Sequence, residues 1–145
     1  MTDRPDPAGA FDPALFVARL KGYGHGGALG IAYVDHGPDW CALSLPYDER
    51  LVVGPNGIVA SGPIVSLMDM ATSLSLWIKL GRFRPQATLD LRVDYLRPAR
   101  PGAEITGRGE CYGITRSVGF TRGLAHDGDP ADPVAHVSAT FMFTG

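Results

Sequence analysis

A long apolar segment that contains a single charge sets the strongest limit on the fold of this chain. From Leu51 to Ile78 the only ionisable side chain is that of Asp69, and most of its neighbours are apolar or small. A helix over Ile64–Ile78 would carry apolar residues on every side, which is typical of a helix surrounded by other structure. Because burying an unpaired carboxylate costs several kcal/mol, Asp69 is a candidate functional residue. A carboxylate at the helix surface or in a cap is the alternative.

Length, charge and the N-terminal residues exclude several classes of protein. The 145 residues fit one domain, over residues 11–145, and the net charge of −2 leaves no basic surface for nucleic acid. The first residues lack the apolar core of a secretory signal. The apolar run Ile64–Leu80 contains Asp69 and several hydroxyl residues, unlike a membrane span. We therefore expect a cytoplasmic protein with neither nucleic acid nor membrane as a partner.

Neither the cysteines nor the histidines have the spacing of a metal site. Cys41 and Cys111 lie far apart in sequence and form no CxxC pair, so we expect them to be reduced and buried. The histidines form no HxxxH or HxH pair, and none lies near a cysteine or carboxylate at ligand spacing. They are His25, His36, His126 and His136. We predict no metal.

The N-terminal part of the chain predicts a tail and one short helix. Residues 1–10 are rich in Pro, Asp and Gly and are expected to form a flexible tail. A helix over Asp12–Leu20 is indicated by a capping Asp12, by Pro13 at the first helical position and by apolar residues at helical spacing. The glycine-rich segment Gly22–Gly27 is expected to end this helix in a loop.

The rest of the chain predicts one long helix inside an antiparallel sheet. Apolar residues 29–34 and 40–45 flank a turn and predict a hairpin, and the helix is expected from Gly62-Pro63 to Gly81. Strands are predicted over residues 88–96, 105–114, 117–125 and 134–143. No crossover helices are available, so the fold class is α+β, with an antiparallel sheet curled around one helix. Such a sheet covers its helix on one side only, so we expect sheets to associate in a dimer.

The first strand after the long helix, residues 88–96, alternates between apolar and polar residues. One predicted face holds Leu89, Leu91, Val93 and Tyr95, and the other holds Thr88, Asp90, Arg92 and Asp94. This pattern is typical of a half-buried strand.

Two segments, read with this order of elements, carry a resemblance to a known family. Residues 57–69 (GIVASGPIVSLMD) cover the start of the helix, and residues 93–102 (VDYLRPARPG) cover the end of the following strand. Over Leu29–Phe143 the chain resembles the hotdog-fold acyl-CoA thioesterases, specifically the PaaI-like branch of the 4-hydroxybenzoyl-CoA thioesterase superfamily. The resemblance implies a hotdog fold, a curved antiparallel sheet wrapped around one long central helix, here preceded by a short N-terminal helix.

The helix entrance departs from the family pattern. In the family, the helix follows a His-Gly-Gly sequence and carries an Asp or Glu nine positions after that histidine. Here Asp69 has that spacing from Ala60, and the segment reads Ala60-Ser61-Gly62, so the histidine and the first glycine are missing. Another His-Gly-Gly occurs at His25-Gly26-Gly27, but no carboxylate follows it at the same spacing. We expect that segment to be a helix-ending loop without a role in chemistry.

The resemblance implies hydrolysis of an acyl-CoA thioester to a free acid and CoA. Asp69 would act as a general base on water or as a nucleophile through an anhydride. The backbone N–H of Ser61, with Gly62 beside it at the helix entrance, would polarise the thioester carbonyl with help from the helix dipole. Ser73, one turn beyond Asp69, and Thr88 would help to hold the carboxylate or the water. The alternatives are a bond from Ser73 to a helix carbonyl and an ordinary strand position for Thr88.

Coenzyme A would bind as part of the substrate, so no separate cofactor is expected. Its phosphates need cationic side chains near the mouth of the site, and the resemblance points to Arg97, Arg100 and Arg116. Asn56 would replace an amide that family members carry before the helix. A solvated surface charge is the alternative for each arginine.

Three functions stay open at this point. Thioester hydrolysis is the main prediction, with a homodimer or a dimer of dimers (a homotetramer) as the assembly. A noncatalytic acyl-CoA binding protein is the first alternative, because the usual histidine and glycine are missing. An acyl-thioester hydratase or dehydratase is the second, although it needs a histidine paired with the carboxylate and the chain has none between His36 and His126.

Overall fold

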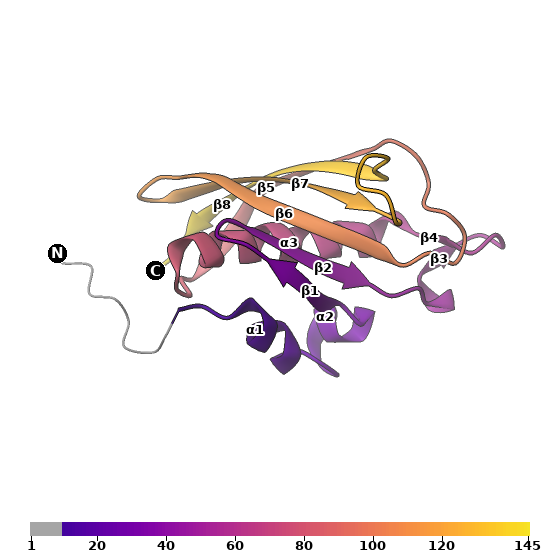
Figure 1. Cartoon of the computed structure of the whole chain (residues 1–145), viewed down its shortest axis with the longest axis horizontal. Coiled ribbons are helices and arrows are strands. Elements are labelled where there is room, and N and C mark those ends of the chain that lie inside the picture. The colour runs from indigo at the N-terminus through magenta and orange to yellow at the C-terminus, as the bar shows by residue number, and fades with distance from the viewer. Residues whose placement is uncertain (1–9) are drawn as a thin grey trace.

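One long helix, α3, spans Ser61–Leu80 and lies under a curved sheet (Figure 1). Its bounds differ by one residue from the prediction. Gly81 ends the helix in the left-handed conformation, with φ at 70°, which glycine adopts without strain. The computed structural model describes residues 10–145, so the predicted tail, residues 1–10, lies outside the described residues except for Ala10.

The other elements are as follows. Helices α1 (Pro13–Arg19) and α2 (Gly24–Leu29) precede the hairpin of β1 (Ala32–His36) and β2 (Trp40–Leu45). A 3₁₀ turn, η1 (Glu49–Leu51), and the short strands β3 (Val52–Val53) and β4 (Ile58–Val59) lead to α3. The remaining strands are β5 (Gln86–Tyr95), β6 (Ile105–Ile114), β7 (Val118–His126) and β8 (Ala135–Phe143).

The main sheet has six strands in the order β1-β2-β6-β7-β8-β5, and all neighbouring pairs are antiparallel. The core lies between this sheet and α3, whose Leu67, Ala71 and Leu74 are fully buried. Figure 1 shows α1 and α2 beside the β1 edge of the sheet. The arrangement confirms the predicted α+β class, with one long helix held by a curved antiparallel sheet.

Glycines on the inner face of the sheet let α3 approach closely. A Cβ at Gly109 of β6 would lie 2.6 Å from backbone atoms of Ala71 and Thr72 on α3. A Cβ at Gly107 would lie 2.8 Å from the side chains of Leu67 and Met68. Backbone atoms cannot rotate out of the way as a side chain can, so the contact at Gly109 fixes the separation of helix and sheet.

Replacing Gly109 with Ala is expected to lower the free energy of unfolding by about 3 kcal/mol, because the new methyl group overlaps the backbone of α3. Urea denaturation measures this loss. Gly113→Ala, also on β6, is the matched control, since its Cβ would meet only the side chain of Phe120 at 3.8 Å. Equal stability of the two variants would show that the helix does not approach the sheet as described.

The segment between the first helix and the first strand differs from the prediction. The prediction of a loop over Gly22–Gly27 is wrong from Gly24 onward, because Gly24–Leu29 form helix α2. The glycines serve close packing: a Cβ at Gly27 would overlap the carbonyl oxygen of Leu20, and one at Gly26 would press on Met70 of α3. Glycine content therefore marks a tightly packed helix here, and the first strand begins at Ala32 instead of residue 29.

A bulge in β5 changes the faces predicted from its alternation. Thr88 pairs with Phe141 of β8 and Asp90 pairs with Thr140, so Leu89 is an extra residue in the ladder. Because Phe141 points into the core, the residue opposite it also faces α3. The prediction that Thr88 lies on the face away from Leu91 is therefore wrong.

Cys41 and Cys111 are both free and buried, as predicted. Burial, together with nearby Asp35, raises the pKa of Cys41 to about 12. Burial also raises the pKa of Cys111. Both thiols stay protonated at neutral pH, and a thiol in that state is a poor nucleophile.

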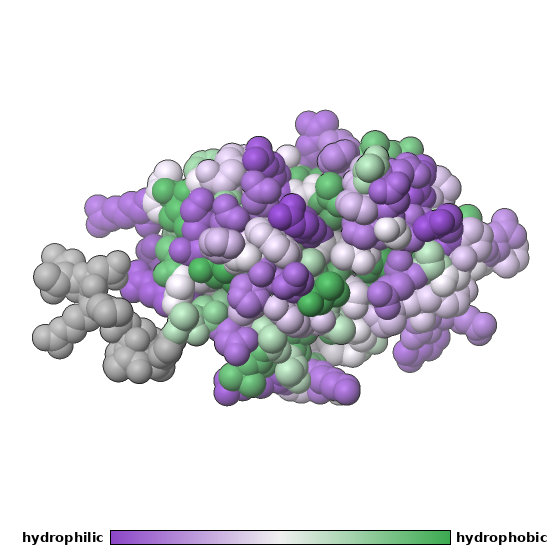
Figure 2. All heavy atoms as spheres, viewed as in Figure 1, coloured by the Kyte–Doolittle hydropathy of each residue, from purple (hydrophilic) through white to green (hydrophobic). Residues whose placement is uncertain are grey.

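The outer surface mixes hydrophilic and hydrophobic residues in small patches on the face seen in Figure 2. Three large hydrophobic side chains on or just after β5 are exposed: Leu89, Tyr95 and Leu96. Within the part of the chain that the structure describes, β5 pairs only with β8, so it is an edge strand with apolar groups in solvent. Within residues 10–145, every helix is too short or too polar to cross a membrane.

Candidate active site

The carboxylate of Asp69 is half-buried and is anchored from the sheet. The hydroxyl of Thr88 donates to Asp69 Oδ1 over 2.9 Å. The bulge in β5 makes this contact possible, because it turns Thr88 toward α3. Asp69 Oδ2 has no hydrogen-bond partner within residues 10–145. Asp69 is thus less enclosed than the sequence predicts, and one of its oxygens is open to water or a ligand.

A cavity of about 310 Å³ lies against Asp69, between α3 and the N-terminal segment. Its apolar walls are formed by Phe16, Leu20, Ile31, Met70, Leu74 and Trp77. The polar side chains at its surface are His25, Ser66, Asp69 and Ser73. Phe16 and Trp77 pack edge to face, with ring centroids 5.3 Å apart. The cavity, called here the Asp69 cavity, therefore offers apolar space beside a carboxylate.

The two hydroxyls predicted to hold the carboxylate or the water behave differently. Thr88 contacts Asp69 directly. Ser73 lines the Asp69 cavity, but its hydroxyl donates to the carbonyl of Met70 over 3.2 Å, the helix bond weighed as its alternative. Within residues 10–145 no group of three or more His, Cys, Asp or Glu side chains could hold a metal ion.

A second cavity, of about 440 Å³, lies at the N-terminal end of α3 and is called here the entrance cavity. Ser61 lines it, and the Tyr95 hydroxyl donates to the Ser61 carbonyl over 3.0 Å. The first N–H groups of a helix have no acceptor within it, and the methyl group of Ala60 cannot cap them. Space is open around Gly62, whose added Cβ would meet no atom within 4 Å. These N–H groups are thus available to an anion or a carbonyl oxygen.

Asn56 is exposed in the turn that joins β3 to β4. Val53 and Ile58, on either side of this turn, line the entrance cavity. The predicted amide is therefore carried by the same hairpin that forms one wall of that cavity.

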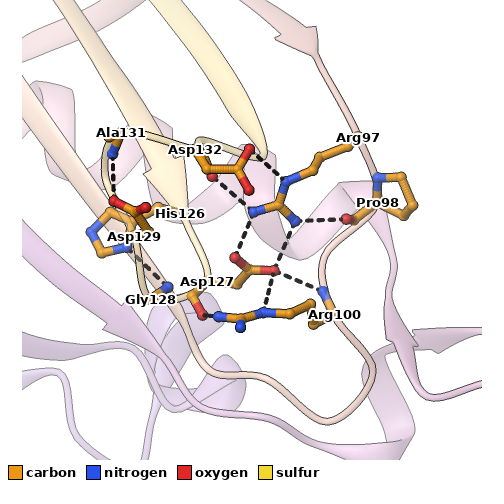
Figure 3. Close-up of polar contacts among 9 residues, drawn as sticks. All are labelled: Arg97, Pro98, Arg100, His126, Asp127, Gly128, Asp129, Ala131 and Asp132. Atoms are coloured by element: carbon orange, nitrogen blue, oxygen red, sulfur yellow. Dashed lines mark hydrogen bonds and ion pairs between the residues drawn. The ribbon is translucent and has the colours of Figure 1, made fainter.

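The predicted arginines Arg97 and Arg100 belong to an ion-pair cluster (Figure 3). Arg97 uses all five of its N–H groups, on the carboxylate of Asp127, the carboxylate and carbonyl of Asp132, and the carbonyl of Pro98. Arg100 donates its backbone N–H to Asp127 over 2.8 Å. The Asp127 side chain is 1% exposed, and hydrogen bonds from Arg97 hold its pKa well below the usual range. The cluster ties the loop after β5 to the loop after β7.

The cluster separates the arginines predicted to bind phosphate. Arg97 has no N–H group left for a phosphate, whereas the side chain of Arg100 is 66% exposed. Arg116 lies far from both, in the turn between β6 and β7, where its carbonyl accepts from Arg84 just beyond the end of α3. Arg97 itself lines the entrance cavity, and Arg100 follows the lining residue Ala99. Arg100 Nη2 donates to the Asp127 carbonyl and its Nε lies 3.5 Å from Asp127 Oδ2, so Nη1 is the Arg100 nitrogen without a partner among residues 10–145.

The sequence model of a known family covers the segment that contains Ser61 and Asp69. The model is that of the thioesterase superfamily, and it matches residues 56–134. This chain belongs to the thioesterase superfamily. Membership of this family, together with the esterase relative described next, supports hydrolase activity on thioesters in general.

Two relatives are similar to the chain over most of its length. A protein of Halobacterium salinarum that carries the provisional name esterase is 30% identical over 127 residues, covering 82% of this chain and 84% of the relative. A solved protein of Pseudomonas aeruginosa is 37% identical, with a TM-score of 0.78 and coverage of 89% of this chain and 94% of that one.

A thioesterase of Haemophilus influenzae is more distant in sequence, at 22% identity, but superposes with a TM-score of 0.79 over 91% of this chain and 90% of its own. The PaaI protein of E. coli, at 16% identity, gives a TM-score of 0.76 over 88% of this chain and 89% of its own. At these identities the likeness shows the fold alone. The chain therefore has the predicted hotdog fold.

The two halves of the predicted site lie apart in a single copy of the chain. Ser61 and Asp69 are eight residues apart on α3, and a helix rises 1.5 Å per residue, so they are separated by about 12 Å along the axis. A thioester carbonyl is far shorter than this distance. One copy of the chain therefore cannot place both groups on the same carbonyl.

Sequence reasoning missed two polar side chains of the Asp69 cavity, His25 and Ser66. The Nε2 atom of His25 lies 2.7 Å from the hydroxyl oxygen of Ser66, and both residues line the Asp69 cavity. The expectation that His25-Gly26-Gly27 has no part in the site rested on the lack of a carboxylate at the family's spacing after His25. Only the packing of α2 on α3 reveals the contact, although the unusual His-Gly-Gly composition marked the segment.

Proposed function

We propose that the protein hydrolyses an acyl-CoA thioester to a free acid and CoA, with Asp69 as the base that activates water. The observation that carries this proposal is the Asp69 carboxylate, held by Thr88 beside an apolar cavity of about 310 Å³. The membership of the chain in the thioesterase superfamily supports the reaction class.

In the proposed reaction Asp69 Oδ1 is held by Thr88 and Oδ2 accepts a proton from water. The water oxygen forms a bond to the thioester carbon, and the carbon–sulfur bond then breaks. The thiolate of CoA takes up the proton that Asp69 received, and the acid leaves. Direct attack by Asp69 through an anhydride is the alternative route to the same products.

Polarisation of the carbonyl is assigned to the free N–H groups at Ser61 and Gly62, aided by the helix dipole. Since these lie about 12 Å from Asp69 of the same chain, we assign them to a second copy of the protein. The edge strand β5 contacts both halves of the site, through Tyr95 to Ser61 and through Thr88 to Asp69.

Antiparallel pairing of two β5 strands through their middle would set Thr88 of one copy opposite Tyr95 of the other. The entrance of one α3 would then lie near Asp69 of its partner. The exposed apolar groups of β5 favour such pairing. If light scattering shows a monomer under conditions in which the protein is fully active, this arrangement is excluded.

The substrate would lie across both cavities. Apolar side chains of the Asp69 cavity suit the acyl group, and the entrance cavity, lined by Val53, Ile58 and Leu96, suits the pantetheine arm. Arg100 is the arginine that we assign to a CoA phosphate, through Nη1, the guanidinium nitrogen that Asp127 does not contact. Arg97 holds the loop that carries Arg100.

A screen of CoA release from short, long and aromatic acyl-CoAs tests the function. With a thiol reagent as the readout, we expect the best substrate to reach a kcat/KM on the order of 10⁴ M⁻¹ s⁻¹. Saturable binding of acyl-CoA without any CoA release would instead indicate a binding protein. Interconversion of enoyl- and hydroxyacyl-CoA without release of CoA would indicate a hydratase.

A further inference from the structure

The hydrogen bond between His25 and Ser66 joins the N-terminal helices to α3 at the Asp69 cavity. The distance from His25 Nε2 to Ser66 Oγ is 2.7 Å. Close packing of Gly26 against Met70 seats α2 on α3 and brings His25 within reach of Ser66. Ser66 lies three residues before Asp69, so the two side chains are neighbours on the same face of the helix.

The hydroxyl of Ser66 is used differently from those of Thr72, Ser73 and Ser75 on α3. Thr72 donates to the carbonyl of Met68, Ser73 to that of Met70, and Ser75 to that of Thr72. Such bonds satisfy the hydroxyl within its own helix. Ser66 bonds instead to a side chain from another element, so His25 fixes how its oxygen is presented to the cavity.

A serine hydroxyl has one hydrogen and two lone pairs. The bond to His25 uses either the hydrogen or one lone pair, depending on the tautomer of the imidazole. In both cases a lone pair of Ser66 Oγ stays free to accept a hydrogen bond from water. A water held between Ser66 Oγ and Asp69 Oδ2 would direct one O–H to each and keep its own lone pair for the thioester carbon.

We propose that His25 is a positioning residue for hydrolysis: through Ser66 it places the attacking water against Asp69. This role rests on the proposed function, since it concerns the water that Asp69 activates. His25 itself does not touch the reacting atoms. The water gives its proton to Asp69, as in the reaction above, and the His25–Ser66 pair neither gains nor loses a proton.

The test compares kcat and KM of four variants on the best acyl-CoA of the screen. His25→Ala is expected to lower kcat by roughly 10- to 100-fold, the cost of a misplaced reactant, with KM nearly unchanged. His25→Gln is expected to recover most of this loss, because its amide can still bond to Ser66. Ser66→Ala is expected to match His25→Ala, and the double variant to be no slower than either, because both remove the same contact.

His36→Ala is the matched control. His36 is exposed, lies outside the Asp69 cavity, and bonds to the hydroxyl of Tyr33 over 2.7 Å, the same length as the bond from His25. This variant is expected to keep the wild-type kcat. Thermal melting followed by circular dichroism shows whether each variant is folded. If His25→Ala is unfolded, Ser66→Ala and His25→Gln are used for the comparison instead.

Several results would overturn the proposal. They are an unchanged kcat in the alanine variants, equal losses in His25→Gln and His25→Ala, losses that multiply in the double variant, or a rise in KM alone, which would mean that α2 merely covers the substrate. If His25→Ala is fully active while Asp69→Asn is inactive, only the role of His25 fails. If the wild type releases no CoA, the proposed function fails and the role of His25 fails with it.

Discussion

The Asp69→Asn variant is expected to release CoA about a thousand-fold more slowly than the wild type, the typical cost of removing a general base. The amide has nearly the same shape as the carboxylate, and its oxygen can still accept the bond from Thr88. The change therefore removes the basic oxygen at Oδ2 and leaves the geometry of the site. Steady-state kinetics on the best acyl-CoA of the screen measures the loss, and thermal melting verifies the fold.

Glu104→Gln controls for the loss of a negative charge. Glu104 is an exposed carboxylate that lines neither the Asp69 cavity nor the entrance cavity. Its conversion to an amide is expected to leave kcat unchanged. Turnover of Asp69→Asn near the wild-type rate would rule out Asp69 as base and as nucleophile, and with it the proposed mechanism.

The fold and the position of Asp69 were accessible from the sequence because both depend on local patterns. Apolar runs bounded by turn residues gave β2 and β6 with the predicted bounds, 40–45 and 105–114. Gly81 marked the end of α3 because a left-handed residue ends a helix most easily at glycine. Asp69 stood out because an isolated carboxylate in an apolar segment needs a partner, and Thr88 supplies one.

The environment of Asp69 was not accessible, because it depends on contacts between elements far apart in sequence. The bulge at Leu89 reverses the face of Thr88, and no residue type in β5 signals it. His25 reaches Ser66 across 41 positions of sequence. Arg97 was predicted to face a phosphate, but Asp127, 30 residues later, takes its donors. The sequence shows where the charged residues are, whereas tertiary packing determines which of them keep hydrogen-bonding groups available for a ligand.

Breaking the ion-pair cluster around Asp127 is expected to have a large effect on the free energy of unfolding. Asp127→Asn is expected to lower the free energy of unfolding at pH 7 by about 3 kcal/mol, because it leaves the Arg97 guanidinium partly buried without its main counter-charge. Urea denaturation measures the change. Asp132→Asn is the matched control: Asp132 also bonds to Arg97, over 3.2 Å, but its side chain is 69% exposed, so a loss within about 1 kcal/mol is expected.

The pH dependence of this effect has a definite sign. Hydrogen bonds from Arg97 lower the pKa of Asp127 in the folded protein relative to the unfolded chain, where an aspartate has a pKa of about 3.9. The unfolded state therefore binds the proton first as the pH falls. The stabilisation by Asp127 is complete above about pH 5 and is lost progressively as the pH falls toward the lower pKa of the folded protein. The stability gap between wild type and Asp127→Asn should narrow progressively as the pH is lowered from 5 to 2. A gap that is constant over this range would mean that the Asp127 carboxylate gains nothing from Arg97 and Arg100 in the folded protein.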